Sequence, residues 1–403
     1  MPKVNPHILR WARETAGLTY EEATKKLDLH QARGVSAVDR LVALESGEQE
    51  PSRPMLVKMA KQYHRPLLIF YMSSPPRKGD RGKDFRTLPQ DHSIVNDALL
   101  DVLIRDVHAR QSMVRAVLEE EEEAERVQFV GSAMMSNGVP AVLESISKTL
   151  KLDLSEFRAQ PSPLDAFALL RASVEAVGVF VLLIGDLGSH HTSINLETFR
   201  GFALADDVAP FVIINDKDSY AAWSFTLLHE LTHLWLGQTG VSGELVELTL
   251  ERFCNDVAGE FLLPSDELAK LKINNTMAFE KAVAYISEFA KRLNISSSMI
   301  AYKLYRSGII ELNTWKNLSA AFRNMWLRER FEQRERTHER EGGPSYYLVR
   351  RQRIGTALVE LVSHMIATGA LSTSKAGKVL GIKAKNVQTL INTGRSLTSL
   401  QRA

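Results

Sequence analysis

The chain lacks the features that mark several classes of protein. It has one cysteine, Cys254, among 403 residues, which excludes an internal disulfide and a zinc site built from cysteines alone. Any metal ion must therefore be held by histidine and carboxylate side chains. The longest apolar run, Val177 to Ile184, has the length of a strand and is far too short to cross a membrane.

An excess of charge of one sign is also missing. Lys and Arg number 50 against 48 Asp and Glu, which argues against a strongly basic nucleic-acid coat and leaves local basic patches open. The hydrophobic fraction of 44% is that of a globular chain, and 403 residues suffice for two or three domains with cores. The amino terminus does not show the basic-then-apolar pattern of a signal peptide. We expect a cytoplasmic protein with no membrane segment.

Periodicity and composition predict an α+β, mostly helical chain. Apolar, β-branched segments at 177–184, 199–204 and 210–215 predict strands, and helices are expected at 219–237 and 244–263. The expected segments are a bundle of five short helices (1–72), a linker (73–94), an α+β domain with flanking helices (95–310), a charged helical connector (311–345) and a C-terminal helical region (346–403). The last region is expected to form a long helix followed by a short helix pair around Gly381.

The predicted helix at 219–237 contains the motif H-E-x-x-H. A spacing of four residues places His229 and His233 on one face of a helix, where both imidazoles can bind one zinc ion. Glu230 then lies beside the metal and can accept a proton from water. Paired histidines could instead be ordinary core or partner-contact residues, but a buried glutamate between them would be costly without a metal.

A zinc ion that activates water takes three protein ligands, so the motif needs a further one. Glu251 is favoured because Asn255, four residues later, can orient that carboxylate or a ligand histidine. Glu247 and Glu260 share a similar face and remain candidates. Cys254 is interpreted as a small buried hydrophobic residue.

Three segments resemble the ImmA/IrrE family of metallopeptidases. They occur in the family's order, at Arg200–Asn215, Phe225–Leu234 and Glu251–Pro264, with Cys254 where the family usually has alanine. The resemblance implies a gluzincin-like minimal metallopeptidase core with a small β-sheet, Zn²⁺ held by His229, His233 and Glu251, and Glu230 as general base. It also implies a protein substrate, typically a helix-turn-helix repressor cut in a stress, mobile-element or defence response.

In related folds an extended substrate adds to an edge strand of the sheet. The segment Pro210 to Asn215 is the expected edge strand here, so Val212, Ile213, Ile214 and Asn215 are predicted to contact the substrate.

Both ends of the chain carry signs of a helix-turn-helix. Residues 1–72 resemble the Cro-like (XRE) repressor class through Leu18–Ala23 and Leu44–Pro51, but the expected recognition helix offers only Arg40 beside acidic residues. DNA binding and protein binding by this end are therefore equally open. Residues 373–387 have the same rhythm and carry Lys375, Lys378, Lys383 and Lys385. They are the better electrostatic candidate for DNA, a solvated surface being the alternative.

The sequence thus predicts a zinc-dependent endopeptidase that cleaves a specific protein partner. The expected partner is a repressor, regulator or toxin–antitoxin component encoded nearby. The alternative is a DNA-binding transcriptional regulator that does not cleave, whose peptidase-like domain senses a ligand or partner. Homo-oligomerisation is left open.

Overall fold

The computed structural model of the chain describes residues 3–76, 94–189, 192–237, 244–273, 277–338 and 345–400. The described residues form two compact units. The first holds residues up to 76, 94–107 and 186–198, and the second holds 108–185 and the described residues from 199 onward. No helix in these described ranges is both long and apolar enough to cross a membrane.

The amino-terminal bundle of the first unit contains four α-helices and a 3-10 helix, where five helices were expected. They are α1 (Pro6–Thr15), α2 (Tyr20–Leu27), α3 (Ala37–Ser46), α4 (Arg53–Gln62) and η1 (Leu67–Tyr71). Thr19 and Glu22 form a capping box at the start of α2, and Gly47, in the left-handed conformation, ends α3. The bundle has a hydrophobic core of its own, which includes Ile8, Leu41 and Phe70.

A buried ion pair joins α1 to α3 inside this bundle. The Arg13 guanidinium donates from Nε to Oε1 of Glu45 at 2.8 Å and from Nη2 to Oε2 at 3.0 Å. Its third nitrogen donates to the Leu18 carbonyl at 2.9 Å, and the guanidinium lies over the Tyr20 ring. The pair therefore ties α1, α3 and the turn before α2 together.

The second unit is built around a three-stranded sheet. Its strands are β1 (Phe180–Leu183), β2 (Gly201–Leu204) and β3 (Phe211–Ile214), which lie where the sequence predicts strands. The spatial order is β1-β3-β2, with β3 parallel to β1 and antiparallel to β2. A mostly helical chain with a small sheet agrees with the expected α+β class.

The sheet order corrects the prediction of the substrate-binding edge. Val212, Ile213 and Ile214 lie in β3, the central strand, and are fully buried with neighbours on both sides. Asn215 is also fully buried, and its side-chain amide donates to the Phe199 carbonyl at 3.1 Å. Because both backbone edges of β3 are already paired, it cannot accept another strand, and the two edge strands of the sheet are β1 and β2.

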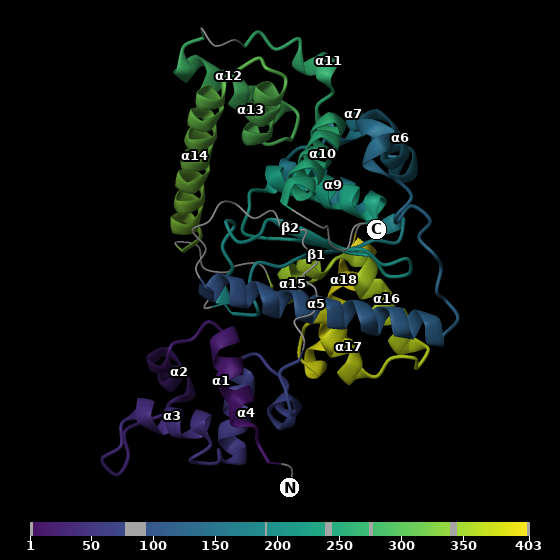
Figure 1. Cartoon of the computed structure of the whole chain (residues 1–403). Helices are drawn as coiled ribbons and strands as arrows, with labels where there is room; N and C mark the ends of the chain where they lie inside the picture. Colours follow the sequence, from purple (N-terminus) through teal and green to yellow (C-terminus); the bar gives the residue numbers. More distant parts are fainter. Residues whose placement is uncertain are drawn as a thin grey trace. The chain divides into compact units, whose positions relative to one another are not determined.

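Helices cover the sheet and extend from it. They are α5 (Ile94–Glu120), η2 (Met135–Asn137), α6 (Gly138–Leu150), α7 (Leu154–Arg158), α8 (Pro163–Ala176), α9 (Tyr220–Leu236), α10 (Glu244–Leu262), α11 (Ser265–Leu268), α12 (Phe279–Arg292), α13 (Ser297–Arg306) and α14 (Leu312–His338). Helix α9 packs on β2 and β3, and α8 packs on β1. Helix α10 packs along α9 (Figure 1). Every residue of α9 from Trp223 onward is buried, as expected for a helix that is apolar on all faces.

The C-terminal region differs from the expected long helix. It forms α15 (Tyr346–Ile354), α16 (Thr356–Ala367), α17 (Thr373–Leu380), η4 (Ala384–Asn386) and α18 (Val387–Leu400). The long helix is broken at Gly355, whose φ is +92° and where a Cβ atom would lie 2.9 Å from the Val181 carbonyl oxygen. Only glycine fits this close approach to β1, so two helices replace one.

Candidate metal centre

Helix α9 supplies the two histidines of the site. Ser219 caps the helix by accepting a hydrogen bond from the Ala222 backbone, and the helix continues without interruption to Leu236. His229 and His233 lie one turn apart on it, each with 1% of its surface exposed. Their Nε2 atoms are 3.1 Å apart. The helix thus turns both imidazoles toward one point.

Helix α10 brings a carboxylate to the same point. The Oε2 atom of Glu251 lies 3.2 Å from Nε2 of His229, and its Oε1 atom lies 3.3 Å from Nε2 of His233. Together the three side chains form a group that could hold a metal ion. Of the two alternatives for the carboxylate, Glu260 is bound instead by Ser265 and Lys303. The side chain of Glu247 lies outside the described residues.

The donor atoms fit a tetrahedral zinc ion. Bonds of 2.0–2.1 Å to zinc place two ligand atoms of a tetrahedron about 3.3 Å apart. The separations of 3.1, 3.2 and 3.3 Å among the two imidazole nitrogens and the carboxylate oxygens agree with that spacing. A metal ion at this point could accept a lone pair from each of the three side chains.

The pKa of Glu251 favours the ionised form that a metal ligand needs. Burial raises its pKa, but the nearby charge of His229 and hydrogen bonding with both histidines outweigh burial. The pKa therefore lies well below its usual range, and the carboxylate stays charged at neutral pH.

The far nitrogen of each imidazole also has a neighbour on α10. Nδ1 of His229 lies 3.0 Å from Oδ1 of Asn255, and Nδ1 of His233 lies 3.6 Å from Sγ of the fully buried Cys254. An amide oxygen accepts a hydrogen bond, so Asn255 favours the tautomer of His229 whose Nε2 lone pair faces the site. The sequence predicted that Asn255 orients a ligand. It did not predict the contact between Cys254 and His233.

Glu230 follows His229 on α9 and is 1% exposed. Strand β2 reaches this side chain closely, because a Cβ atom at Gly201 would lie 2.9 Å from Oε1 of Glu230 and 2.5 Å from Cγ2 of Thr226. Glycine at position 201 therefore makes room for the carboxylate beside the edge strand. Glu230 of the H-E-x-x-H motif therefore lies directly beside β2, an edge strand of the sheet.

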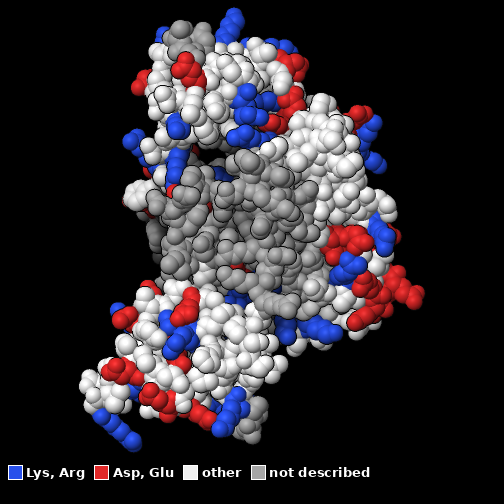
Figure 2. All heavy atoms as spheres, viewed as in Figure 1, with Lys and Arg blue, Asp and Glu red and all other residues white. Residues whose placement is uncertain are grey.

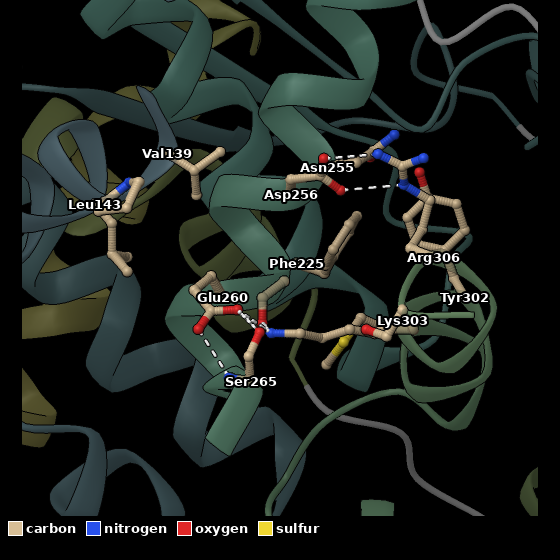
Figure 3. Close-up of a pocket in the computed structure, with 14 residues that line it drawn as sticks. Val139, Leu143, Phe225, Asn255, Asp256, Glu260, Ser265, Tyr302, Lys303 and Arg306 are labelled. Atoms are coloured by element: carbon tan, nitrogen blue, oxygen red, sulfur yellow. Dashed lines mark hydrogen bonds and ion pairs between the residues drawn. The ribbon is translucent and has the colours of Figure 1, made fainter. Parts of the chain in front are cut away.

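A cavity of about 460 Å³ adjoins the metal centre between α6, α9, α10 and α13 (Figure 3). Phe225 and Asn255 line it, so it reaches the side chain that contacts His229. Val139 and Leu143 of α6 form an apolar side. Two ion pairs, Asp256 with Arg306 and Glu260 with Lys303, line the side formed by α10 and α13. Sequence periodicity gave no sign of this cavity, since α6 was not predicted.

The remaining candidates lie away from these helices. Arg40 on α3 donates from Nη1 to the His30 carbonyl at 2.6 Å, which holds its guanidinium against the bundle. Lys375, Lys383 and Lys385 are exposed on α17 and the turn after it. Their proposed contact with DNA stays a prediction.

Two histidines on α9 and a glutamate on α10 around one point, with a buried glutamate beside them, form the donor set of a metallopeptidase-like site. Residues 185–305 match the family model of the IrrE N-terminal-like domain (Peptidase_M78). This match supports the ImmA/IrrE family and a metallopeptidase-like function of that type. It runs from the end of β1 to α13 and includes all three candidate ligands. No curated protein and no solved structure matches the chain.

Proposed function

We propose that the protein is a zinc-dependent endopeptidase that cuts a specific protein partner. The observation that carries this proposal is the convergence of two imidazole nitrogens and a carboxylate at 3.1–3.3 Å, next to the buried Glu230. His229, His233 and Glu251 would hold the zinc ion, with Asn255 orienting His229. When bound, zinc supplies Lewis acidity that polarises the scissile carbonyl and lowers the pKa of the attacking water.

Glu230 performs the proton transfers in this proposal. Its carboxylate accepts a proton from the attacking water and then delivers that proton to the nitrogen of the leaving amine. The buried position of Glu230 keeps bulk water away from the carboxyl group. No second acid is needed, because one proton serves both steps.

The edge strand β2 is the proposed docking place for an extended substrate. The Asn215 backbone N–H donates to the Arg200 carbonyl. In this antiparallel pair every second residue of β2, beginning with Phe202, therefore directs its backbone N–H and C=O groups toward β3. Gly201 and Ala203 then direct theirs outward, and a substrate strand that pairs there passes beside Glu230. We propose a helix-turn-helix repressor or toxin–antitoxin component as the partner, following the family resemblance.

Glu230→Gln tests the role of the general base. The variant should keep about one zinc per chain and lose cleavage by at least ~10³-fold, because the amide cannot accept the proton. Zinc is measured by elemental analysis, and cleavage by labelling new protein amino termini in cells that express each variant. Glu288→Gln, an exposed residue of α12, is the matched control and should cleave normally.

Two outcomes would contradict the proposal. A Glu230→Gln protein that cuts at the wild-type rate removes the role of Glu230. A folded wild type that binds no zinc when zinc is supplied removes the metal centre. In the second case the favoured function becomes that of a DNA-binding regulator whose peptidase-like domain senses a ligand or partner.

A further inference from the structure

The C-terminal region is strongly basic, although the chain as a whole is balanced in charge. Residues 345–403 contain nine Lys and Arg against one acidic residue, Glu360, although the whole chain has 50 Lys and Arg against 48 Asp and Glu. Residues 361–403 contain no Asp or Glu. Such a local excess of positive charge creates an electric field that attracts a polyanion.

This basic region folds as two helices joined by a tight turn. Gly381 ends α17 in the left-handed conformation, and the Ile382 backbone N–H donates to the Gly377 carbonyl at 2.8 Å. Three residues later η4 begins and leads directly into α18. A Cβ atom at Gly377 would lie 2.9 Å from the Ile382 carbonyl oxygen, so α17 packs closely on the turn. A short turn with glycine between two packed helices is the form of a helix-turn-helix.

Helices α15 and α16 support this pair. Helix α18 packs on α15, and α17 packs on α16. The apolar side chains of α18 that face this support, Val387, Leu390 and Ile391, are buried. Packing therefore fixes which side of α18 is presented to solvent.

The solvent side of α18 carries polar groups suited to base edges. Gln388, Thr389 and Asn392 are exposed, and Gln388 Nε2 donates to Asn392 Oδ1 at 3.1 Å. Gln and Asn side chains pair with adenine in the major groove, and the first turns of the second helix usually reach the bases. Lys383 and Lys385 are exposed just before this helix, where phosphates of a bound duplex would lie.

Five consecutive glutamates, Glu119–Glu123, lie at the other end of this region. Glu123 contacts His364 near the end of α16 at 3.2 Å, whereas Lys383 and Lys385 follow the far end of α17. Figure 2 shows blue side chains where Figure 1 places α17, and red side chains near the end of α5. The basic turn is thus spatially separated from the glutamates.

We propose that the α17–α18 pair binds duplex DNA, with the exposed side of α18 in the major groove and Lys383 and Lys385 on the phosphates. The amino-terminal bundle is the weaker candidate. Its α3 ties Arg40 to a backbone carbonyl, carries Asp39 in its first turn and is followed by the exposed Glu48 and Glu50. This binding is independent of the peptidase reaction.

The test uses full-length protein with Glu230→Gln in every sample, so that cleavage cannot interfere. Binding to a labelled random-sequence duplex of about 30 base pairs is measured by fluorescence anisotropy from about 50 to 200 mM salt. Lys383→Glu with Lys385→Glu should weaken binding at least ~10-fold and reduce the slope of log affinity against log salt by about 2. The matched control is Lys25→Glu with Lys26→Glu, two exposed residues of α2, which should bind like the parent.

Sequence readout is tested by selection from a pool of random duplexes. Gln388→Ala and Asn392→Ala should relax the selected sequence while they leave the salt slope unchanged, because they contact bases and not phosphates. Circular dichroism confirms that each variant is folded, and Lys383→Gln with Lys385→Gln gives a milder second pair.

Three results would overturn the proposal. In the first, the parent protein does not bind the duplex at the lowest salt. In the second, it binds single-stranded RNA of the same length more tightly than the duplex. Alternatively, the α2 control loses affinity while the α17–α18 variants keep it, which assigns DNA binding to the amino-terminal bundle. None of these results bears on zinc binding or on the role of Glu230.

Discussion

At the amino-terminal end, Arg13 and Glu45 pair between two helices of one bundle, and every partner of the guanidinium described above belongs to that bundle. At the carboxy-terminal end, the buried ion pair that contacts α15 and α16 belongs to neither of these helices. Arg171 and Glu175 belong to α8 of the sheet-containing unit, and they contact the junction of α15 and α16. Both ends form short helices joined by turns, but they are stabilised in different ways.

The Arg171–Glu175 pair satisfies the backbone at this junction. Arg171 donates to the carbonyls of Gln352 and Val181, which joins the end of α15 to β1. Glu175 accepts from the backbone N–H groups of Thr356 and Ala357 at 3.1 and 3.2 Å, which caps the start of α16. The C-terminal helices therefore depend on α8, whereas the amino-terminal bundle supplies its own partners.

Arg171→Ala is expected to have the largest effect on stability. It leaves Glu175 as a buried charge without its guanidinium and leaves the Gln352 and Val181 carbonyls without this donor, so the free energy of unfolding should fall by about 3–5 kcal/mol. Denaturant titration measures the loss, and elemental analysis should show less bound zinc, because α8 packs on α9. Arg126→Ala, whose side chain is 76% exposed, is the control. A loss below about 1 kcal/mol would show that α15 and α16 hold without the pair.

Arg13→Ala should lower the free energy of unfolding by a smaller amount, about 3 kcal/mol. The Glu45 carboxylate would still have a positive partner, because Nε of Arg10 lies 4.0 Å from its Oε2 atom. The loss should be confined to the first unit, with zinc content unchanged at one per chain. Hydrogen exchange then accelerates in α1–α4 and not in α9 or α10. Faster exchange in α9 would contradict the contrast between a self-contained bundle and a C-terminal region that depends on its neighbours.

The two regions also differ in how far sequence patterns could describe them. Local sequence patterns predicted the positions of the strands and the meeting of His229, His233 and Glu251, because each strand is a short continuous segment and the three side chains lie on two helices that follow each other in the chain. The order of the strands depends on non-local pairing, so the pattern of β3 did not reveal that it is central. The sequence pattern likewise does not predict the helix break at Gly355, because the break depends on contact with Val181, which is far away in the sequence.

The helix caps give the smallest and most local comparison. Ser372 accepts a hydrogen bond from the Lys375 backbone at 3.3 Å at the start of α17, and Thr19 accepts one from the Glu22 backbone at 3.2 Å at the start of α2. Ser372→Ala and Thr19→Ala should each lower the free energy of unfolding by ~1 kcal/mol.

The site of that loss separates the two ends. Ser372→Ala should accelerate hydrogen exchange in α17 and in α16, because α17 packs on α16, which in turn packs on α8. Thr19→Ala should accelerate exchange in α2 and its neighbours α3 and α4 alone. If Ser372→Ala affected only α17, the C-terminal helices would be independent of one another, and α18 would lose the fixed orientation that reading a DNA sequence requires.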